Sequence, residues 1–130
     1  MELMSAALSE GDTVPDLFNC EGDDLSPPLE WSGVPEGTAE LRVSLVDPDA
    51  PGGTFVHWLV TGIDPSSSRV GQGAVPSGGT EQENSFGEAR YRGPCPPPGD
   101  RPHRYVFAVE ALDEIGVVLE SGELTTSYGR

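Results

Sequence analysis

Apolar side chains recur at every second position in several short segments, and no stretch of the chain shows the 3.6-residue period of an amphipathic helix. This alternation predicts strands at 41–46, 55–63, 104–112 and 117–119, with weaker candidates at 3–8, 29–31 and 124–128. Seventeen glycines and thirteen prolines punctuate the chain. We therefore predict an all-β chain with few or no helices, and the spacing of the strands favours a two-sheet sandwich.

Residues 65–89 interrupt this pattern with a polar stretch rich in Gly and Ser. The stretch is too long for a tight turn, so we predict an excursion over the surface. Long surface loops are either functional or simply mobile, and the sequence leaves both alternatives open.

Polar side chains occupy positions at the edge of the predicted core. The apolar face of strand 41–46 continues into Asp47 just where the strand ends, which places a carboxylate at the rim. His57 lies inside a strand that is apolar on both faces, so its ring is predicted to be mostly buried. His103 and Tyr105 share one face at the start of another strand. Each of these residues also has an ordinary structural interpretation, as a turn acid or a hydrogen-bonded core side chain.

A stiff loop precedes His103. In "GPCPPPGD", residues 93–100, two glycines bracket four prolines. Because proline fixes φ and lacks an N–H, the remaining amides and carbonyls of this loop point in set directions. The loop is a candidate pocket wall.

The charge of the chain excludes some partners. It carries 22 acidic residues against 7 basic ones, a formal net charge of −15, and all the basic residues are arginine. Such a surface repels nucleic acid and anionic membranes. The absence of lysine fits either a high-salt host or a GC-rich genome, and both explanations stay open.

The N-terminal sequence has no basic, apolar leader, and no later segment approaches the roughly 20 apolar residues of a membrane span. We therefore expect a cytoplasmic protein. In that reducing compartment two free thiols at Cys20 and Cys95 are favoured over a disulfide. No pair of Cys or His residues has the close spacing of a zinc site, so no metal is expected.

Several motifs in a fixed order resemble the phosphatidylethanolamine-binding protein family, in its bacterial and archaeal Raf kinase inhibitor-like branch. They are "DPDAP" (47–51), "HW" (57–58), "GPCPPPGD" (93–100) and "HRYVFAVEALD" (103–113). The segments 11–38 and "NSFGEARY" (84–91) and the terminal "YGR" (128–130) also match. The resemblance spans nearly the whole chain and is typical of one domain over residues 1–130.

The resemblance implies an antiparallel Greek-key β-sandwich with a small anion pocket near one edge. Carried onto this sequence, the ligand-binding residues are Asp47, Asp49, Pro51, His57, Gly93, Pro96, His103 and Tyr105. It also implies a tight turn with a cis Ala50–Pro51 bond, and we expect Asp47 to bond His57 or an amide of the rigid loop. One departure stands out: residues 111–130 leave no room for the helical stretch that this branch usually inserts there, which puts the rim of the pocket in doubt.

Three classes of function follow. The leading one is a non-enzymatic protein that binds a small anionic or phosphorylated ligand, without cofactor, and regulates a protein partner. The second is a protease inhibitor or other interaction module that acts through a surface loop. A hydrolase is less favoured, because no nucleophile elbow or metal pattern is present. A homodimer is left open.

Overall fold

Strands make up the regular structure of the computed structural model, which describes residues 1–130. In chain order the elements are β1 (Glu2–Met4), the 3-10 helix η1 (Asp16–Phe18), β2 (Leu29–Ser32), β3 (Glu40–Asp47), β4 (Phe55–Ile63), β5 (Arg69–Val70), β6 (Thr80–Glu81), β7 (His103–Leu112) and β8 (Val118–Tyr128). The predicted all-β class is confirmed. No helical segment is both long and apolar enough to cross a membrane.

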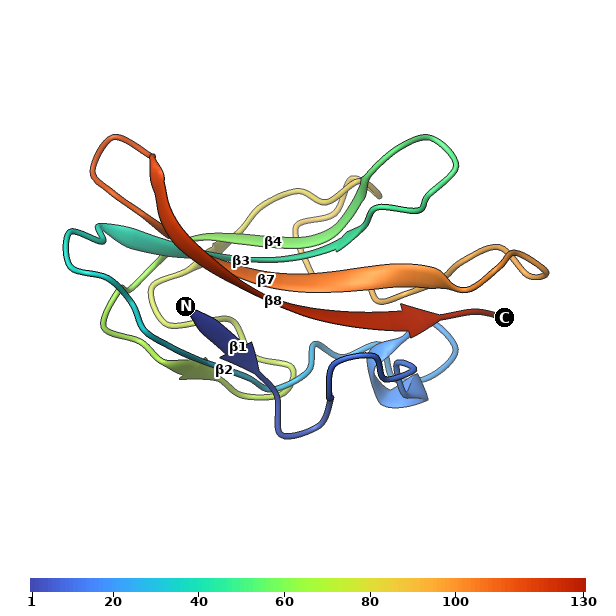
Figure 1. Ribbon diagram of the computed structural model, residues 1–130. Helices are drawn as coiled ribbons and strands as arrows, with labels where there is room; N and C mark the ends of the chain where they lie inside the picture. The colour runs from blue at the N-terminus through green and yellow to red at the C-terminus, as the bar shows by residue number, and fades with distance from the viewer.

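The strands form two antiparallel sheets. One has the order β1-β2-β5, and the other has the order β6-β4-β3-β7-β8. Figure 1 shows β1 and β2 beneath the long strands of the larger sheet. In that sheet β3 lies between β4 and β7, so the end of β3 meets the beginning of β7. This register brings segments almost sixty residues apart together at one edge.

The core lies between the sheets and follows the predicted alternation. Leu41, Val43 and Leu45 of β3 are fully buried, and Asp47 at the end of the same face is 3% exposed. The smaller sheet contributes Trp31, whose indole N–H donates to the Ser67 carbonyl at 2.8 Å. Apolar burial therefore fixes which face of β3 turns inward, and Asp47 follows it by periodicity.

Two features of the strands differ from the prediction. Segments 117–119 and 124–128 belong to one continuous strand, β8, because the polar stretch between them pairs with β7 through its backbone. The predicted surface excursion at 65–89 contains β5 and β6, which pair with β2 and β4. Backbone pairing needs no apolar side chain, and the sequence pattern therefore missed these pieces.

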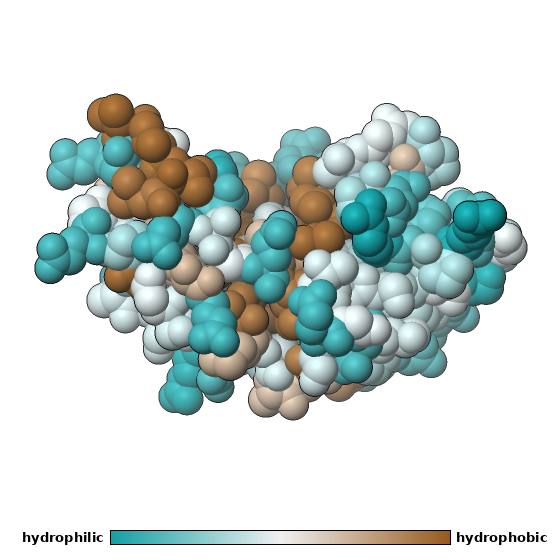
Figure 2. Space-filling view, viewed as in Figure 1, coloured by the Kyte–Doolittle hydropathy of each residue, from teal (hydrophilic) through white to brown (hydrophobic).

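A tight turn of five residues joins β7 to β8, and no helix lies between them. Asp113 closes it: its Oδ1 accepts the amides of Ile115 at 3.0 Å and Val117 at 2.9 Å. The tip projects from the body of the protein and is apolar (Figure 2). Ile115 is 85% exposed there.

Candidate ligand-binding site

A buried pair, Asp47 and His103, occupies the edge where β3 ends and β7 begins. Asp47 Oδ2 lies 2.7 Å from His103 Nδ1, and the other ring nitrogen lies 3.2 Å from Asp100 Oδ2. Burial alone would lower the pKa of His103, but the hydrogen bonds and charges of Asp47 and Asp100 outweigh it and raise that pKa. With a carboxylate at each nitrogen, both nitrogens donate in the imidazolium form.

The partner of Asp47 differs from the one we predicted. Its carboxylate bonds His103 and, through Oδ1, the backbone amide of Asp49 at 2.8 Å, and it bonds neither His57 nor an amide of the rigid loop. The prediction of its partner is therefore wrong. The reason is that the antiparallel register of β3 and β7 brings His103 to Asp47, whereas His57 already has a partner of its own.

His57 has one bonded and one open ring nitrogen. The ring is buried as predicted, 4% exposed, and its Nδ1 lies 2.7 Å from the carbonyl oxygen of Arg92. Because a carbonyl only accepts, Nδ1 carries the proton. Burial lowers the pKa of His57, and the Arg92 carbonyl opposes this. Nε2 makes no close hydrogen bond, while every fully buried side-chain nitrogen and oxygen has one, so Nε2 keeps a small solvent-accessible area.

Tyr105 places a second polar atom, its buried hydroxyl, next to His57. The rings of Tyr105 and His57 meet edge to face, with centroids 5.4 Å apart. The His103 ring stacks against Tyr105, with centroids 6.3 Å apart. Burial, followed by the negative charge of Asp47, raises the pKa of Tyr105, so its hydroxyl keeps its proton. That hydroxyl faces the Asp47 carboxylate, which raises its pKa, and the backbone of Cys95, which opposes the rise, and Tyr105 as a whole is 1% exposed.

The rigid loop is tied to the chain after η1. The Gly93 amide donates to Asp24 Oδ1 at 2.8 Å, and the Cys20 amide donates to the Pro94 carbonyl at 3.2 Å. A Cβ at Gly93 would overlap the Phe18 carbonyl oxygen, which explains a glycine at this position. The loop is therefore held as a fixed wall beside His57.

A disulfide fastens the same two segments. Cys20 and Cys95 are bonded, with Cα atoms 5.4 Å apart, and no free cysteine is present. The expectation of two free thiols is wrong. It rested on an assumed reducing compartment, and the sequence separation of 75 residues gave no sign that the two segments meet.

The structure brings together most of the residues proposed from sequence. Asp47, His57, His103 and Tyr105 form the cluster, and Gly93 and Pro96 are buried in the adjoining loop. A cavity of about 410 Å³ adjoins His103 and is lined by Asp49, Asp100, Arg101, Pro102 and His103.

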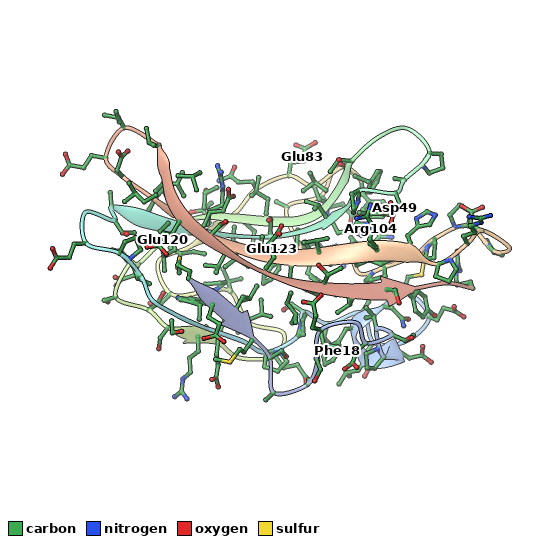
Figure 3. The ribbon with its side chains drawn as sticks, in the orientation of Figure 1. Phe18, Asp49, Glu83, Arg104, Glu120 and Glu123 are labelled. Atoms are coloured by element: carbon green, nitrogen blue, oxygen red, sulfur yellow. A yellow bond between two sulfur atoms is a disulfide. The ribbon has the colours of Figure 1, made fainter.

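Pro51 lies apart from this cluster. It is exposed in the turn between β3 and β4, and the Ala50–Pro51 bond is trans, so the prediction of a cis bond is wrong. Asp49 binds Arg104 through both carboxylate oxygens, and the two side chains lie together in Figure 3. Asp49 thereby neutralises the nearest arginine of β7.

Several residues of the site were not singled out from sequence. Phe55 and Phe86 surround His57, with ring centroids 5.2 and 5.5 Å from its own. The Arg92 guanidinium stacks over Phe86 at 4.4 Å. Asn84 shapes this segment, because its Oδ1 accepts the Phe86 amide at 2.9 Å. The motif "NSFGEARY" was the only sequence signal for this wall.

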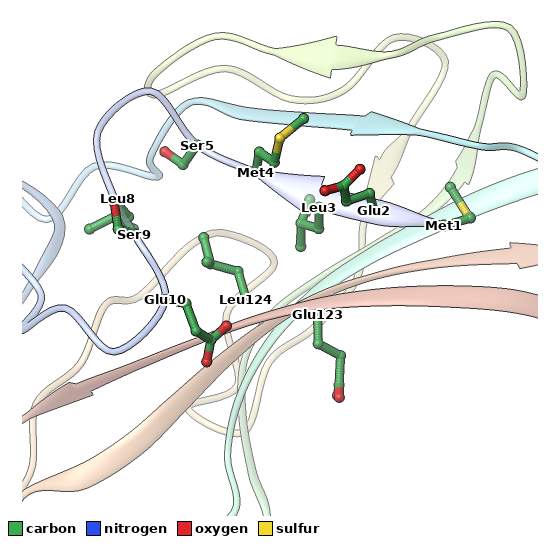
Figure 4. A pocket seen from close by; sticks show the side chains of 10 residues that line it. All are labelled: Met1, Glu2, Leu3, Met4, Ser5, Leu8, Ser9, Glu10, Glu123 and Leu124. Carbon is green, nitrogen blue, oxygen red and sulfur yellow. The ribbon is translucent and has the colours of Figure 1, made fainter.

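A larger cavity lies elsewhere, between β1 and β8 (Figure 4). Its volume is about 490 Å³, and its lining combines Leu3, Leu8 and Leu124 with Glu2 and other polar residues. Every charged side chain that lines it is a glutamate. The one cationic group at this cavity, the Met1 ammonium, is paired with Glu120 at 2.8 Å, so the cavity offers an anion no uncompensated positive charge.

Comparisons with known proteins agree on one family. The family model described as "Phosphatidylethanolamine-binding protein" matches residues 4–127. The chain is 44% identical over 112 residues to a putative lipoprotein LppC of Mycobacterium tuberculosis, covering 86% of this chain but only 55% of that relative. It is 42% identical over 127 residues to a UPF0098 protein of Aquifex aeolicus, covering 94% of this chain and 74% of the relative.

Solved structures show the same fold. Escherichia coli YbcL, described as a new member of the mammalian PEBP family, superposes with a TM-score of 0.93 at 31% identity, over 99% of this chain and 98% of that one. A PEBP homologue, CT736 of Chlamydia trachomatis, gives 0.88 at 32% identity, over 99% and 97% of the two chains.

Proposed function

The chain belongs to the phosphatidylethanolamine-binding protein family, and on that premise we propose that it is a binding protein whose Tyr105 and His57 hold a small phosphate or carboxylate group. One observation carries the proposal. The Tyr105 hydroxyl and His57 Nε2 lie on buried rings 5.4 Å apart and have no close hydrogen-bond partner, in a cluster whose other polar atoms are already bonded. Two adjacent free polar atoms with an aromatic surround are typical of a ligand pocket.

The protonation states determine which ligand fits. Tyr105 donates its proton, because its raised pKa keeps the phenol neutral. His57 already uses its Nδ1 proton for the Arg92 carbonyl, so Nε2 donates to an anion only when the ring is protonated. An anion at this place therefore binds together with a proton, and its affinity rises as the pH falls.

A binding role without chemistry is part of the proposal. Both cysteines are in the disulfide, so neither supplies a thiolate nucleophile. Asp47 and Asp100 are engaged by His103, and the Tyr105 phenolate is disfavoured by its raised pKa. These contacts support ligand exchange rather than hydrolysis.

The wider setting also belongs to the proposal. Regulation of a protein partner by the bound ligand stays a prediction, as does a homodimer. A cytoplasmic location stays a prediction too, and the Cys20–Cys95 disulfide weighs against it, because such bonds persist mainly in oxidising compartments. The mycobacterial relative carries the name of a lipoprotein, which fits an extracytoplasmic setting for this chain as well.

A titration with inorganic phosphate tests the site. We expect Tyr105→Phe to lose most of the phosphate affinity, because the open hydroxyl disappears while the buried ring stays. Tyr128→Phe is the matched control, since the Tyr128 hydroxyl donates to Glu21 at 2.6 Å instead. Binding is followed by the amide shifts of β4, β7 and the loop 93–100. Equal affinity in the wild type and Tyr105→Phe would remove this residue from the site.

A further inference from the structure

An acidic protein that binds an anion needs a local positive charge that is not already cancelled. Four of the seven arginines are in ion pairs with carboxylates: Arg42, Arg90, Arg92 and Arg104. The other three, Arg69, Arg101 and Arg130, form no ion pair. Any of these three could supply uncompensated positive charge, and their positions decide between them.

Arg130 lies against the rigid loop that walls the site. Tyr128 at the end of β8 pairs with His103 in the sheet, so the chain that follows passes directly beside the loop. The Gly99 amide donates to the Arg130 carbonyl at 3.0 Å. The Arg130 Nε donates to the Pro96 carbonyl at 2.7 Å. Backbone and side chain are thus both anchored to the loop.

This anchoring leaves the terminal amino groups of Arg130 free. Only Nε has a partner in the protein, and the residue is exposed. The charge reaches the site, because the Arg130 guanidinium opposes the rise in the pKa of Tyr105 that burial and Asp47 produce. A guanidinium held through Nε presents its two amino groups as a fixed fork, the geometry that matches a phosphate or carboxylate.

We propose that Arg130 is a ligand-contacting residue of this site, whose terminal amino groups bind the same anion as the Tyr105 hydroxyl and His57 Nε2. The inference rests on the function proposed above and names the cation that the function requires. It also explains how a chain of net charge −15 holds an anion at one place.

The other unpaired arginines fit this role less well. Arg69 lies on β5 in the smaller sheet, opposite Glu30, and lines a different cavity. Arg101 lines the cavity beside His103 together with the carboxylates of Asp49 and Asp100. Arg69 therefore provides a control of equal charge that is remote from the site.

The experiment compares phosphate affinity at constant pH and ionic strength in the wild type, Arg130→Gln, Arg130→Lys and Arg69→Gln. Arg130→Gln removes the two charge-assisted hydrogen bonds of the guanidinium amino groups, so its phosphate affinity should be about 10-fold lower or more. Arg130→Lys keeps the charge but not the paired amino groups, so its phosphate affinity should lie between those of the wild type and Arg130→Gln. Arg69→Gln should match the wild type. In the wild type, the Nε–H resonance of Arg130 should shift on addition of phosphate.

The outcomes separate the two proposals. Wild-type affinity in Arg130→Gln, or a loss no larger than in Arg69→Gln, overturns the role of Arg130. If Tyr105→Phe nevertheless abolishes binding, the proposed function stands without Arg130. If the wild type does not bind phosphate, both proposals fail. Thermal unfolding of each variant shows whether the fold is kept, and a loss in Arg130→Gln without a shift of the Arg130 resonance also contradicts a direct contact.

Discussion

Removing the Cys20–Cys95 disulfide should strongly destabilise the protein while leaving its fold in place. The bond joins residues 75 positions apart. In the chain-entropy treatment a loop of this length corresponds to about 4.5 kcal/mol at 25 °C, which comes from the restricted unfolded chain. A domain of this size is stable by about 5–15 kcal/mol, so the bond accounts for about 30% of the total or more.

The native structure does not depend on the bond alone. The Cys20 amide still reaches the Pro94 carbonyl at 3.2 Å, the Gly93 amide reaches Asp24 at 2.8 Å, and the Tyr91 hydroxyl donates to the Phe18 carbonyl at 2.7 Å. We therefore expect a folded but weaker protein, with spectral changes confined to the two joined segments.

Urea denaturation of the double variant Cys20→Ala/Cys95→Ala and of the oxidised wild type measures the effect. The midpoint should fall by an amount equivalent to several kcal/mol. The wild type unfolded under reducing conditions should match the variant, which separates the loss of the bond from the change of side chains. Two titratable thiols in the purified native wild type, or a difference below about 1 kcal/mol, would refute the role assigned to this disulfide.

Three further predictions follow from the site and its surroundings. Gly93→Ala should cost about 1–3 kcal/mol in urea denaturation, because its Cβ overlaps the Phe18 carbonyl oxygen, whereas Gly52→Ala meets no neighbour and should be nearly neutral. The raised pKa of His103 means that its pairing with Asp47 stabilises the protein fully below about pH 6.5 and less as the pH rises through the pKa of His103 in the folded protein. Asp47→Asn should therefore weaken the fall of the urea midpoint with rising pH. An unchanged slope counts against the pair. Phosphate affinity, measured by calorimetric titration, should increase from low to moderate concentrations of a non-competing salt, because salt screens the net charge of −15 more than contacts inside the site. A monotonic decrease of the affinity with salt would show that long-range repulsion is unimportant.

The fold was predictable where apolar side chains alternate. The period of β3 predicted both its core face and the position of Asp47 at the rim. The outer half of β8 and the short strands β5 and β6 were missed, because backbone hydrogen bonds hold them with few buried side chains. Alternation reports burial and not pairing.

The site was predictable as a set of residues but not as a set of contacts. Its members could be named from the motifs, yet the partner of Asp47 depends on the register of β3 against β7. Which nitrogen of His57 carries the proton is determined by the backbone carbonyl of Arg92, 35 residues away in the sequence. The disulfide and the approach of Arg130 to Pro96 likewise join segments far apart in the chain. Such contacts are properties of the folded arrangement.

The most direct test of the anion site is the ionisation of His57 followed by nitrogen NMR of its ring as phosphate is added at pH 7. The lowered pKa predicts a neutral ring with the proton on Nδ1 in the absence of phosphate. Bound phosphate should convert it to the imidazolium, with both nitrogens protonated and the titration of His57 moved to higher pH. His103, the only other histidine, already has a carboxylate at each nitrogen and serves as the internal reference. If the two ring nitrogens of His57 keep their chemical shifts while phosphate saturates the protein, the anion does not bind at His57 Nε2, and the central claim is contradicted.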